Sequence, residues 1–324
     1  MPSADGRKHA TLFLHFPCFD GVVSAVLASS FLEKVHGWAV DALEPVSYDI
    51  KDQWLDRVLP APSAVVDFLY HPQAEFWADH HSTSFLTTEA KADFERRRSS
   101  WLLYDGKRGS CASLLWSHVR EHLPRKSNFE EMVRWAEKID SASYDSVEEA
   151  IASRHPALVL TRSLAVEPDQ AYLEFLVFGL RQHSLEEIAE SNEVRRRFDE
   201  AESDSALGLK YIAKNIHLVG GVALFDVENN GAFLNRYAPY YFYPKALYSI
   251  GIVRFENSTK ITAMRNPWLN FESVNLGDFM KGFGGGGHQR VGSVIVPNDQ
   301  TDKISQVVSD LLRFTSETNL KVMA

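Results

Sequence analysis

The sequence is poor in cysteine and lacks long apolar runs. Its 324 residues include two cysteines, Cys18 and Cys111, which form no CxxC pair, so a disulfide framework is not indicated. No apolar run approaches the roughly 18 residues needed to span a bilayer. The apolar stretch at residues 10–16 is too short for a secretory signal. These absences predict a cytoplasmic protein with no membrane partner.

Positive charge is also scarce, because 34 Lys and Arg stand against 43 Asp and Glu, a net charge of −9. Proteins that track long duplex nucleic acid usually carry a broad basic footprint, so such a partner is not expected. An anionic substrate should be small and should meet metal ions or a local cluster of positive charge. The sequence leaves open whether the protein is a monomer or a homodimer.

The order of apolar and helical segments predicts an α/β fold in two domains. Residues 1–183 should form a parallel-rich sheet flanked by helices, residues 184–214 a linker helix, and residues 215–324 a smaller α+β domain. The strands expected in the first domain are Ala10–Phe16, Val46–Ile50, Ser63–Phe68 and Glu75–Ala78, and those in the second are Ile216–Asp226, Ala246–Phe255, Lys260–Met264 and Ser293–Val296. The helices expected are Val22–Val35, Ser110–His122, Phe129–Ile139, Gln170–Leu180 and Asp302–Ser316.

Two features of this layout have competing interpretations. Arg195, Arg196 and Arg197 in the linker helix could form an anion patch, but the solvated face of a connecting helix is the preferred interpretation. Residues Tyr237–Tyr243 carry five aromatic rings, which could stack on nucleotide bases. Packing in the domain core or in a subunit contact is the preferred interpretation of these rings.

Acids and histidines gather where the expected strands of the first domain end. They are His15, Asp20, Asp67, Asp79, His80 and His81, joined by Asp140 at the end of a helix. Ligands of an open parallel sheet bind outside the carboxyl ends of its strands. Each residue alone could be a turn or a satisfied strand-end histidine, but together they could hold two divalent ions. An oxygen-rich mixed set suits Mn²⁺ or Mg²⁺.

The second domain contains a glycine run directly before a histidine. The run is Gly284, Gly285, Gly286 and Gly287, followed by His288. Four glycines cost much backbone entropy, but they allow amide N–H groups to converge on an anion. Arg290 and Arg265, which closes a nearby expected strand, add positive charge. The alternative is a glycine-rich turn that binds nothing.

Together these motifs resemble the DHH phosphoesterase family, in its two-domain form with a C-terminal DHH-associated domain, like oligoribonucleases and bisphosphonucleotide phosphatases. The matching stretches are His15–Gly21, Val66–Phe68, Asp79–His81, Ile139–Asp140, Met264–Arg265 and Gly282–His288, in the family's order. The resemblance implies a cytoplasmic, usually Mn²⁺-dependent hydrolase. Known substrates of the family include short oligonucleotides, small nucleotides and polyphosphates.

The resemblance also implies a role for each residue. In the metal site, His15 and the position of Cys18 should hold the first ion, Asp67 should bridge both, and Asp20, His80 and Asp140 should hold the second. Asp79 should support a ligating histidine, and His81 should face the scissile phosphate. In the second domain, Arg265, Gly284, Gly285, Gly286, Gly287 and His288 should bind the substrate's terminal phosphate.

The sequence departs from the family's commonest pattern at Cys18, where an aspartate is usual. A thiolate ligand is softer and favours Zn²⁺ or Fe²⁺ over Mn²⁺. A neutral thiol would leave the first ion short of a charge, and a third interpretation is that Cys18 is merely packed.

The predicted function is hydrolysis of phosphoester bonds in short oligonucleotides or small nucleotides by water that two metal ions activate. The alternatives are a polyphosphate or pyrophosphate hydrolase and a catalytically weakened nucleotide-binding protein.

Overall fold

The computed structural model describes residues 6–123 and 127–323, which divide into two compact units. The first unit comprises Met1–Ser143 and Arg154–Ala201, and the second comprises Tyr144–Ser153 and Glu202–Ala324. The division falls inside helix α9 (Asn192–Asn215), which therefore contributes residues to both units. No helix in the described ranges has the length and apolar character needed to cross a membrane.

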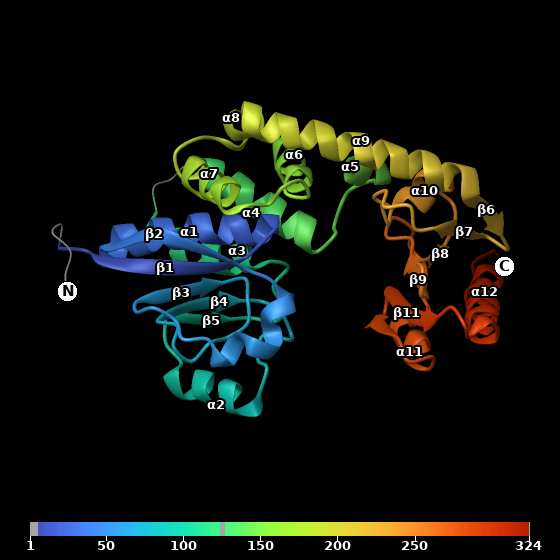
Figure 1. Ribbon diagram of the computed structural model, residues 1–324, viewed down its shortest axis with the longest axis horizontal. Helices are drawn as coiled ribbons and strands as arrows, with labels where there is room; N and C mark the ends of the chain where they lie inside the picture. The colour runs from blue at the N-terminus through green and yellow to red at the C-terminus, as the bar shows by residue number, and fades with distance from the viewer. Residues whose placement is uncertain (1–5, 124–126, 324) are drawn as a thin grey trace. The chain divides into compact units, whose positions relative to one another are not determined.

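A five-stranded parallel sheet in the order β2-β1-β3-β4-β5 forms the centre of the first unit (Figure 1). The strands are β1 (Lys8–His15), β2 (Trp38–Val46), β3 (Ser63–Val66), β4 (Phe76–Asp79) and β5 (Leu102–Tyr104). Strands β3 and β4 are buried along their whole length, as apolar strands covered on both faces should be. This confirms the predicted α/β class and the parallel sheet.

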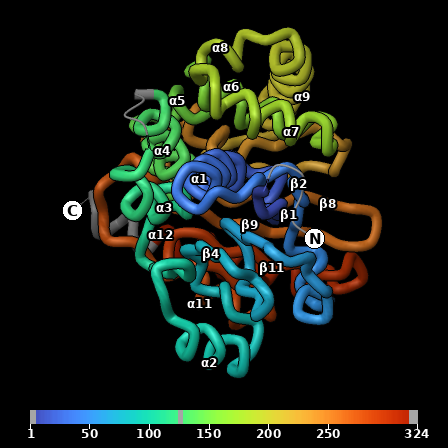
Figure 2. The backbone as a smooth tube through the Cα atoms, turned by 90° about the vertical axis from the view of Figure 1, so that its left-hand side faces the viewer, coloured from blue at the N-terminus to red at the C-terminus, as the bar shows by residue number. Residues whose placement is uncertain are grey.

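Helices cover both faces of this sheet (Figure 2). Helix α1 packs on one face with α7 beside it, and Trp54 of η1 and Phe94 of α2 pack with Phe13 and Trp77 of the sheet on the other. The helices of the unit are α1 (Phe19–His36), η1 (Tyr48–Asp56), α2 (Thr88–Arg97), α3 (Cys111–Val119), α4 (Ser127–Asp140), α6 (Pro156–Ser163), α7 (Gln170–Leu180) and α8 (Leu185–Ala189). Burial of nearly all of α1 explains why its sequence is apolar all round.

The structure corrects the expected strand at Val46–Ile50. Strand β2 ends at Val46, and the chain then turns into the 3-10 helix η1, which begins at Tyr48. β2 is an edge strand of the sheet, and edge strands tolerate charged residues and proline. These residues interrupt the apolar pattern of β2, so the strand was not recognised in the sequence. The correction places Tyr48 at the carboxyl edge of the sheet rather than inside a strand.

The expected linker helix is also divided. Helix α8 ends at Ala189 and α9 begins at Asn192. Ser184 caps α8 in a reciprocal capping box with Glu187. This cap fixes the start of α8 as predicted, whereas the break before α9 was not expected.

The three arginines of α9 do not form an anion patch. Arg195 and Arg196 are exposed and pair with nearby acids, as a solvated face requires. Arg197 contradicts that interpretation because it is buried. Its guanidinium lies 4.0 Å over the ring of Tyr172 and pairs with Glu193, so it anchors α9 to α7.

The second unit contains a six-stranded mixed sheet in the order β10-β11-β9-β8-β7-β6. Its strands are β6 (Ile216–Val219), β7 (Val222–Glu228), β8 (Tyr248–Arg254), β9 (Ser258–Arg265), β10 (Gly286–His288) and β11 (Val291–Pro297), and its helices are α5 (Val147–Ala152), α10 (Ala238–Phe242), α11 (Leu276–Lys281) and α12 (Thr301–Met323). The single strand expected at Ile216–Asp226 is a hairpin instead, because Gly220 and Gly221 turn the chain at φ 55° and 82°.

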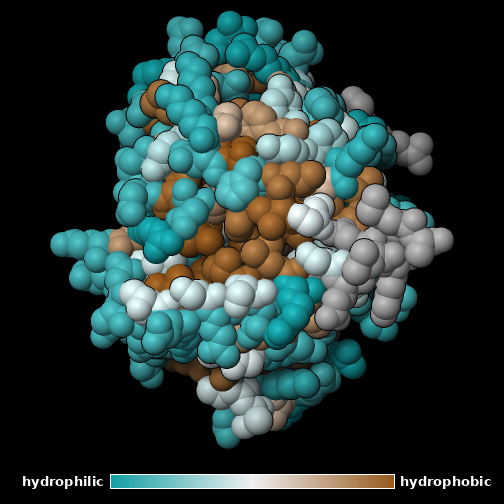
Figure 3. Space-filling model, turned by 90° about the vertical axis from the view of Figure 1, so that its right-hand side faces the viewer, coloured by the Kyte–Doolittle hydropathy of each residue, from teal (hydrophilic) through white to brown (hydrophobic). Residues whose placement is uncertain are grey.

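Apolar side chains reach the surface of the second unit. Figure 3 shows an apolar area on the face that lies at the right of Figure 1. Exposed apolar side chains of this unit include Leu218 and Val219 on the edge strand β6 and Tyr241 on α10.

Candidate metal centre

The carboxyl ends of three neighbouring strands bring the predicted acids and histidines together. His15 is the last residue of β1, Asp67 follows β3, and Asp79 ends β4. In a parallel sheet of this strand order, ligands bind at the point where the order reverses, between β1 and β3. The connections that leave these two strands run to opposite faces of the sheet. His15 Nδ1 lies 3.5 Å from Asp67 Oδ2 across that point.

Three sets of side chains among the described residues have the spacing of metal ligands. They are His15, Cys18 and Asp67; Asp20, His80 and Asp140; and Asp67, Asp79, His80 and His81, with the candidate ligand atoms of each set within 4.8 Å of one another. His80 Nε2 lies 3.7 Å from Asp67 Oδ1 and 3.4 Å from Asp140 Oδ2. These separations are longer than direct hydrogen bonds and leave room for an ion between the atoms. All six predicted ligands therefore meet in one place.

Unpaired buried atoms test whether metal ions fit this site. Both carboxylate oxygens of Asp67, Nδ1 of His15 and Nε2 of His80 are buried without a hydrogen-bond partner among the described residues. An unsatisfied buried polar group costs about 1–3 kcal/mol, and a charged one costs more. Divalent ions would satisfy all four atoms at once, so the residues present fit such ions.

The backbone at Asp67 has an uncommon conformation. Its φ is 56°, in the left-handed region that aspartate and asparagine adopt more readily than other residues with a side chain. The Asp67 N–H donates to the carbonyl of Ala78 at 2.9 Å, which ties the turn to β4.

Burial sets the protonation of the site. Burial, followed by the charges of Asp20 and Cys18, raises the pKa of Asp67 well above its usual range. Burial, followed by the charge of Asp140, raises the pKa of Asp20 to about 6. Burial also lowers the pKa of His15 to about 4, which leaves a neutral imidazole able to bind a metal. Because cations relieve repulsion among carboxylates, the cluster favours divalent ions.

Backbone groups orient two of the ligands. The carboxylate of Asp20 accepts the N–H groups of Cys111 at 2.7 Å and Ala112 at 2.8 Å, at the start of α3. His80 Nδ1 lies 3.1 Å from the carbonyl oxygen of Arg108. The proton of His80 therefore belongs on Nδ1, which leaves the lone pair of Nε2 facing the acids.

His81 is held by Asp79, and both belong to the set of candidate ligands that also contains Asp67 and His80. Its Nδ1 lies 2.8 Å from Asp79 Oδ1, and Ser84 donates to Asp79 Oδ2 at 2.5 Å. Burial lowers the pKa of His81, but the hydrogen bond and charge of Asp79 outweigh it and raise the pKa overall. Asp79 thus supports the ring of His81, the residue expected to face the phosphate, whereas the resemblance implies support of a ligating histidine.

Cys18 stands at the N-cap of α1, in the first ligand set. Burial, followed by the charge of Asp20, raises the pKa of its thiol to about 12. Without a metal the sulfur therefore carries a proton, and an ion that binds it must displace that proton.

Replacing Cys18 with aspartate should change the metal preference. We expect Cys18→Asp to bind Mn²⁺ about tenfold more tightly, because a hard, charged oxygen replaces a protonated sulfur. Titration calorimetry with Mn²⁺ and Zn²⁺ measures both affinities, and Cys18→Ser serves as the uncharged control. Equal Mn²⁺ affinity in Cys18→Asp and the wild type would show that the sulfur position does not face the ion.

The structure adds residues that the motifs did not reveal. Ser84, the carbonyl of Arg108 and the ring of Tyr48 all contact the predicted histidines or their supporting acid. Of these, Tyr48 could have been found from the sequence, because it follows a strand of the same parallel sheet. It was missed because the expected strand Val46–Ile50 included Tyr48.

Two of the four amides in the glycine run bind carbonyls of the protein. The N–H of Gly284 donates to the carbonyl of Lys281 and that of Gly285 to the carbonyl of Met280, so these two amides do not converge on an anion. Residues 286–288 form strand β10, which pairs with β11. The side chains of His288 and Arg290 are exposed, and they are the groups of this segment that remain available to a phosphate.

The side chain of Arg265 makes its hydrogen bonds within the protein. It is 8% exposed, and its guanidinium donates to the carbonyls of Asn266, Leu269 and Phe271. The guanidinium also lies 4.3 Å over the ring of Phe271. This geometry favours a structural role for Arg265, in place of the expected contact with substrate phosphate.

Two neighbouring glycines allow a matched test of the glycine run. A Cβ at Gly286 would meet nothing within 4 Å, whereas one at Gly285 would lie 2.2 Å from the carbonyl oxygen of Ser293. We expect Gly286→Ala to keep the stability and substrate KM of the wild type, and Gly285→Ala to lower the melting temperature. A large rise of KM in Gly286→Ala alone would restore the anion-binding interpretation.

The aromatic run of the second unit is divided between core and surface. Tyr240 is fully buried and donates to the carbonyl of Met264 at 2.6 Å, so it cannot stack on a base. Tyr241 is 45% exposed. Packing in the core therefore holds for Tyr240 and not for Tyr241, for which a subunit contact remains a prediction.

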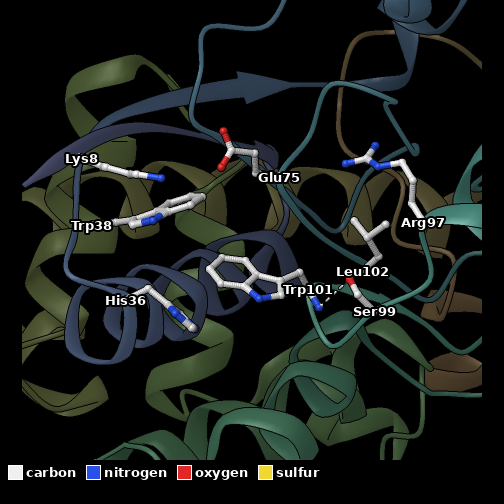
Figure 4. Close-up of a pocket in the computed structure, with 8 residues that line it drawn as sticks. All are labelled: Lys8, His36, Trp38, Glu75, Arg97, Ser99, Trp101 and Leu102. Carbon is white, nitrogen blue, oxygen red and sulfur yellow. Dashed lines mark hydrogen bonds between the residues drawn. The ribbon is translucent and has the colours of Figure 1, made fainter. Parts of the chain in front are cut away.

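A cavity of about 600 Å³ lies at the opposite edge of the first sheet (Figure 4). It is lined by Lys8, His36, Trp38, Glu75, Arg97, Ser99, Trp101 and Leu102. Lys8, Trp38 and Leu102 begin β1, β2 and β5, so the cavity opens at the amino ends of the strands. It contains none of the predicted site residues.

Solved structures share this fold along nearly the whole chain. The pGpG-specific phosphodiesterase PggH from Vibrio cholerae has a TM-score of 0.73 and 19% identity, covering 94% of this chain and 99% of that one. RecJ from Thermus thermophilus, in complex with Mn²⁺, has a TM-score of 0.55 and 12% identity, covering 95% of this chain and 52% of that one. No family model matches the chain, and no curated protein matches its sequence. The structural likeness confirms the fold that the motifs predicted.

Proposed function

We propose that this protein is a divalent-metal-dependent phosphoesterase that cleaves short oligonucleotides or linear dinucleotides in the cytoplasm. The observation that carries the proposal is the set of buried, unpaired atoms on His15, Asp67 and His80 at the carboxyl edge of the sheet. Mn²⁺ is the ion we propose, because carboxylates are the most frequent ligand type in the set, three of the six. The similar RecJ structure was solved with Mn²⁺.

The chain's own residues would divide the work as follows. Bound divalent ions supply a water of lowered pKa and stabilise charge on the phosphate oxygens. The six ligands would hold the ions, with Asp67 between them. Asp79 would fix His81 through Nδ1 so that Nε2 donates a proton to the leaving oxygen. The raised pKa of His81 keeps that proton available near neutral pH.

The choice of substrate rests on the fold and on the local charge. The protein of similar structure from Vibrio cholerae is named for hydrolysis of pGpG, a small linear dinucleotide. A net charge of −9 disfavours long nucleic acids. Exposed His288 and Arg290 would contact the substrate's terminal phosphate.

The second candidate is a nucleotide-binding protein with weakened catalysis. The protonated thiol of Cys18 favours it, because a neutral group stands where a charged ligand would help to hold the first ion. This candidate would bind the same small nucleotides without turning them over.

A panel of substrates tests the proposal and separates the candidates. Metal-free protein would be incubated with Mn²⁺ or with a chelator, and with a linear dinucleotide, a cyclic dinucleotide, a short oligoribonucleotide, a bisphosphorylated nucleotide and polyphosphate. We expect Mn²⁺-dependent cleavage of the linear dinucleotide or the oligoribonucleotide. Release of phosphate from polyphosphate alone would contradict the substrate proposal, and binding without cleavage would favour the second candidate.

A further inference from the structure

Tyr48 presents an unused hydrogen-bond donor beside the metal centre. Its hydroxyl is buried and has no partner in the described parts of the chain. Its ring packs edge-on against His15, with ring centroids 5.1 Å apart, and against His81, with centroids 5.9 Å apart. It therefore lies between a predicted metal ligand and the predicted proton donor.

The surroundings of this hydroxyl contain acceptors that it does not reach. Both oxygens of Asp67 are buried and unpaired as well, and no hydrogen bond is formed between the two residues. A buried donor and buried acceptors that belong to one site and have no protein partners are free to bind a group that enters the site.

From this geometry we propose that the Tyr48 hydroxyl donates a hydrogen bond to a non-bridging oxygen of the substrate phosphate. The inference rests on the proposed function and adds a substrate-contacting residue to it. A phosphate is the group that fits, because its oxygens accept from the hydroxyl, and divalent ions held by the candidate ligand sets would balance its charge. A hydroxyl aimed at developing phosphate charge in a dry site contributes to catalysis as an oxyanion donor does.

The packing of the Tyr48 side chain supports this role. It is the first residue of η1, directly beyond the end of β2, and its ring also packs on Phe68 with centroids 5.2 Å apart. Because Phe68 directly follows Asp67 in the chain, its contact with the Tyr48 ring links the position of the Tyr48 hydroxyl to that of the Asp67 carboxylate. Side chains fixed in this way hold a hydrogen bond without a loss of rotamer freedom on binding.

Tyr48→Phe isolates the hydroxyl because it keeps every ring contact. In the Mn²⁺-loaded protein we expect the affinity for inorganic phosphate, measured by calorimetry, to fall about tenfold. With the cleaved dinucleotide we expect kcat to fall about 30-fold. The number of bound ions should not change, and the melting temperature of the metal-free protein should stay equal or rise, because an unpaired buried group has been removed.

Tyr70→Phe is the matched control, since the hydroxyl of Tyr70 has protein partners, Asp93 at 2.7 Å and Arg97 at 3.1 Å. It should lower the melting temperature and leave phosphate affinity and kcat unchanged. If the wild type is active and Tyr48→Phe has the same phosphate affinity and kcat, the inference about Tyr48 is wrong. The proposed function would stand in that case. A lower melting temperature with loss of metal would also overturn the inference, in favour of a structural role. A wild type that neither cleaves nor binds phosphate would refute the proposed function and the inference with it.

Discussion

Asp67→Asn should abolish Mn²⁺-dependent phosphoester cleavage, with kcat falling on the order of 10³-fold. Asp67 is the residue that the candidate ligand sets approach, through His15 at 3.5 Å and His80 at 3.7 Å. An amide offers one neutral oxygen where a carboxylate offers two charged ones. Both ions should therefore bind more weakly. Steady-state kinetics over a Mn²⁺ titration measures the loss.

The same substitution should make the metal-free protein more stable. A buried, unpaired carboxylate destabilises the folded state, and its removal should raise the free energy of unfolding by about 1–3 kcal/mol. Asparagine tolerates the left-handed φ of 56° at this position. Asp67→Ala is the control, because alanine tolerates that φ less well and should lose part of the gain. An Asn variant that is both active and no more stable would contradict the metal-bridge assignment.

Gly21→Ala should remove the first metal site by steric means alone. A Cβ at Gly21 would lie 1.9 Å from the carbonyl oxygen of His15 and 3.4 Å from Asp67 Oδ2. The oxygen of His15 belongs to the backbone of β1, so the strand end that carries the ligand must move. We expect about 1–3 kcal/mol of destabilisation from overpacking and at least a 100-fold loss of activity, as misplacement by about 1 Å can cause.

Gly179→Ala provides the comparison for this variant. Its Cβ would meet the tip of the Ile188 side chain at 2.8 Å, which can turn away. Because Gly179 lies inside α7, alanine should gain about 0.5–1 kcal/mol of helix stability and leave metal binding unchanged. If Gly21→Ala retains two ions and full activity, the close contact between α1 and β1 does not position the ligands.

Most of the candidate site could be predicted from the sequence, because its acids and histidines stand at the ends of strands that are easily recognised. Strands β3 and β4 are short apolar runs, and Asp67 and Asp79 stand at their ends. A parallel sheet brings such ends to one edge whatever the connections are. Asp140 was found differently, from its place in a motif at the end of α4, since its distance to His80 depends on tertiary packing.

The missed features leave little or no signal in the sequence. The polar edge strand β2 lacks an apolar signature, so its end and Tyr48 were misplaced. The carbonyl of Arg108 reaches His80 across 28 residues, and a carbonyl has no sequence signal. The glycine run was misjudged because the partners of its amides, Met280 and Lys281, belong to the end of α11.

Counting the ions bound per chain tests the central claim most directly. Metal-free protein would be dialysed to equilibrium against Mn²⁺ and its metal content measured by elemental analysis, with Asp67→Asn treated in parallel. The site described by His15, Asp67 and His80 predicts two ions per wild-type chain and a clear loss in the variant. A wild-type chain that holds no ion, or that holds the same number as Asp67→Asn, would contradict the claim.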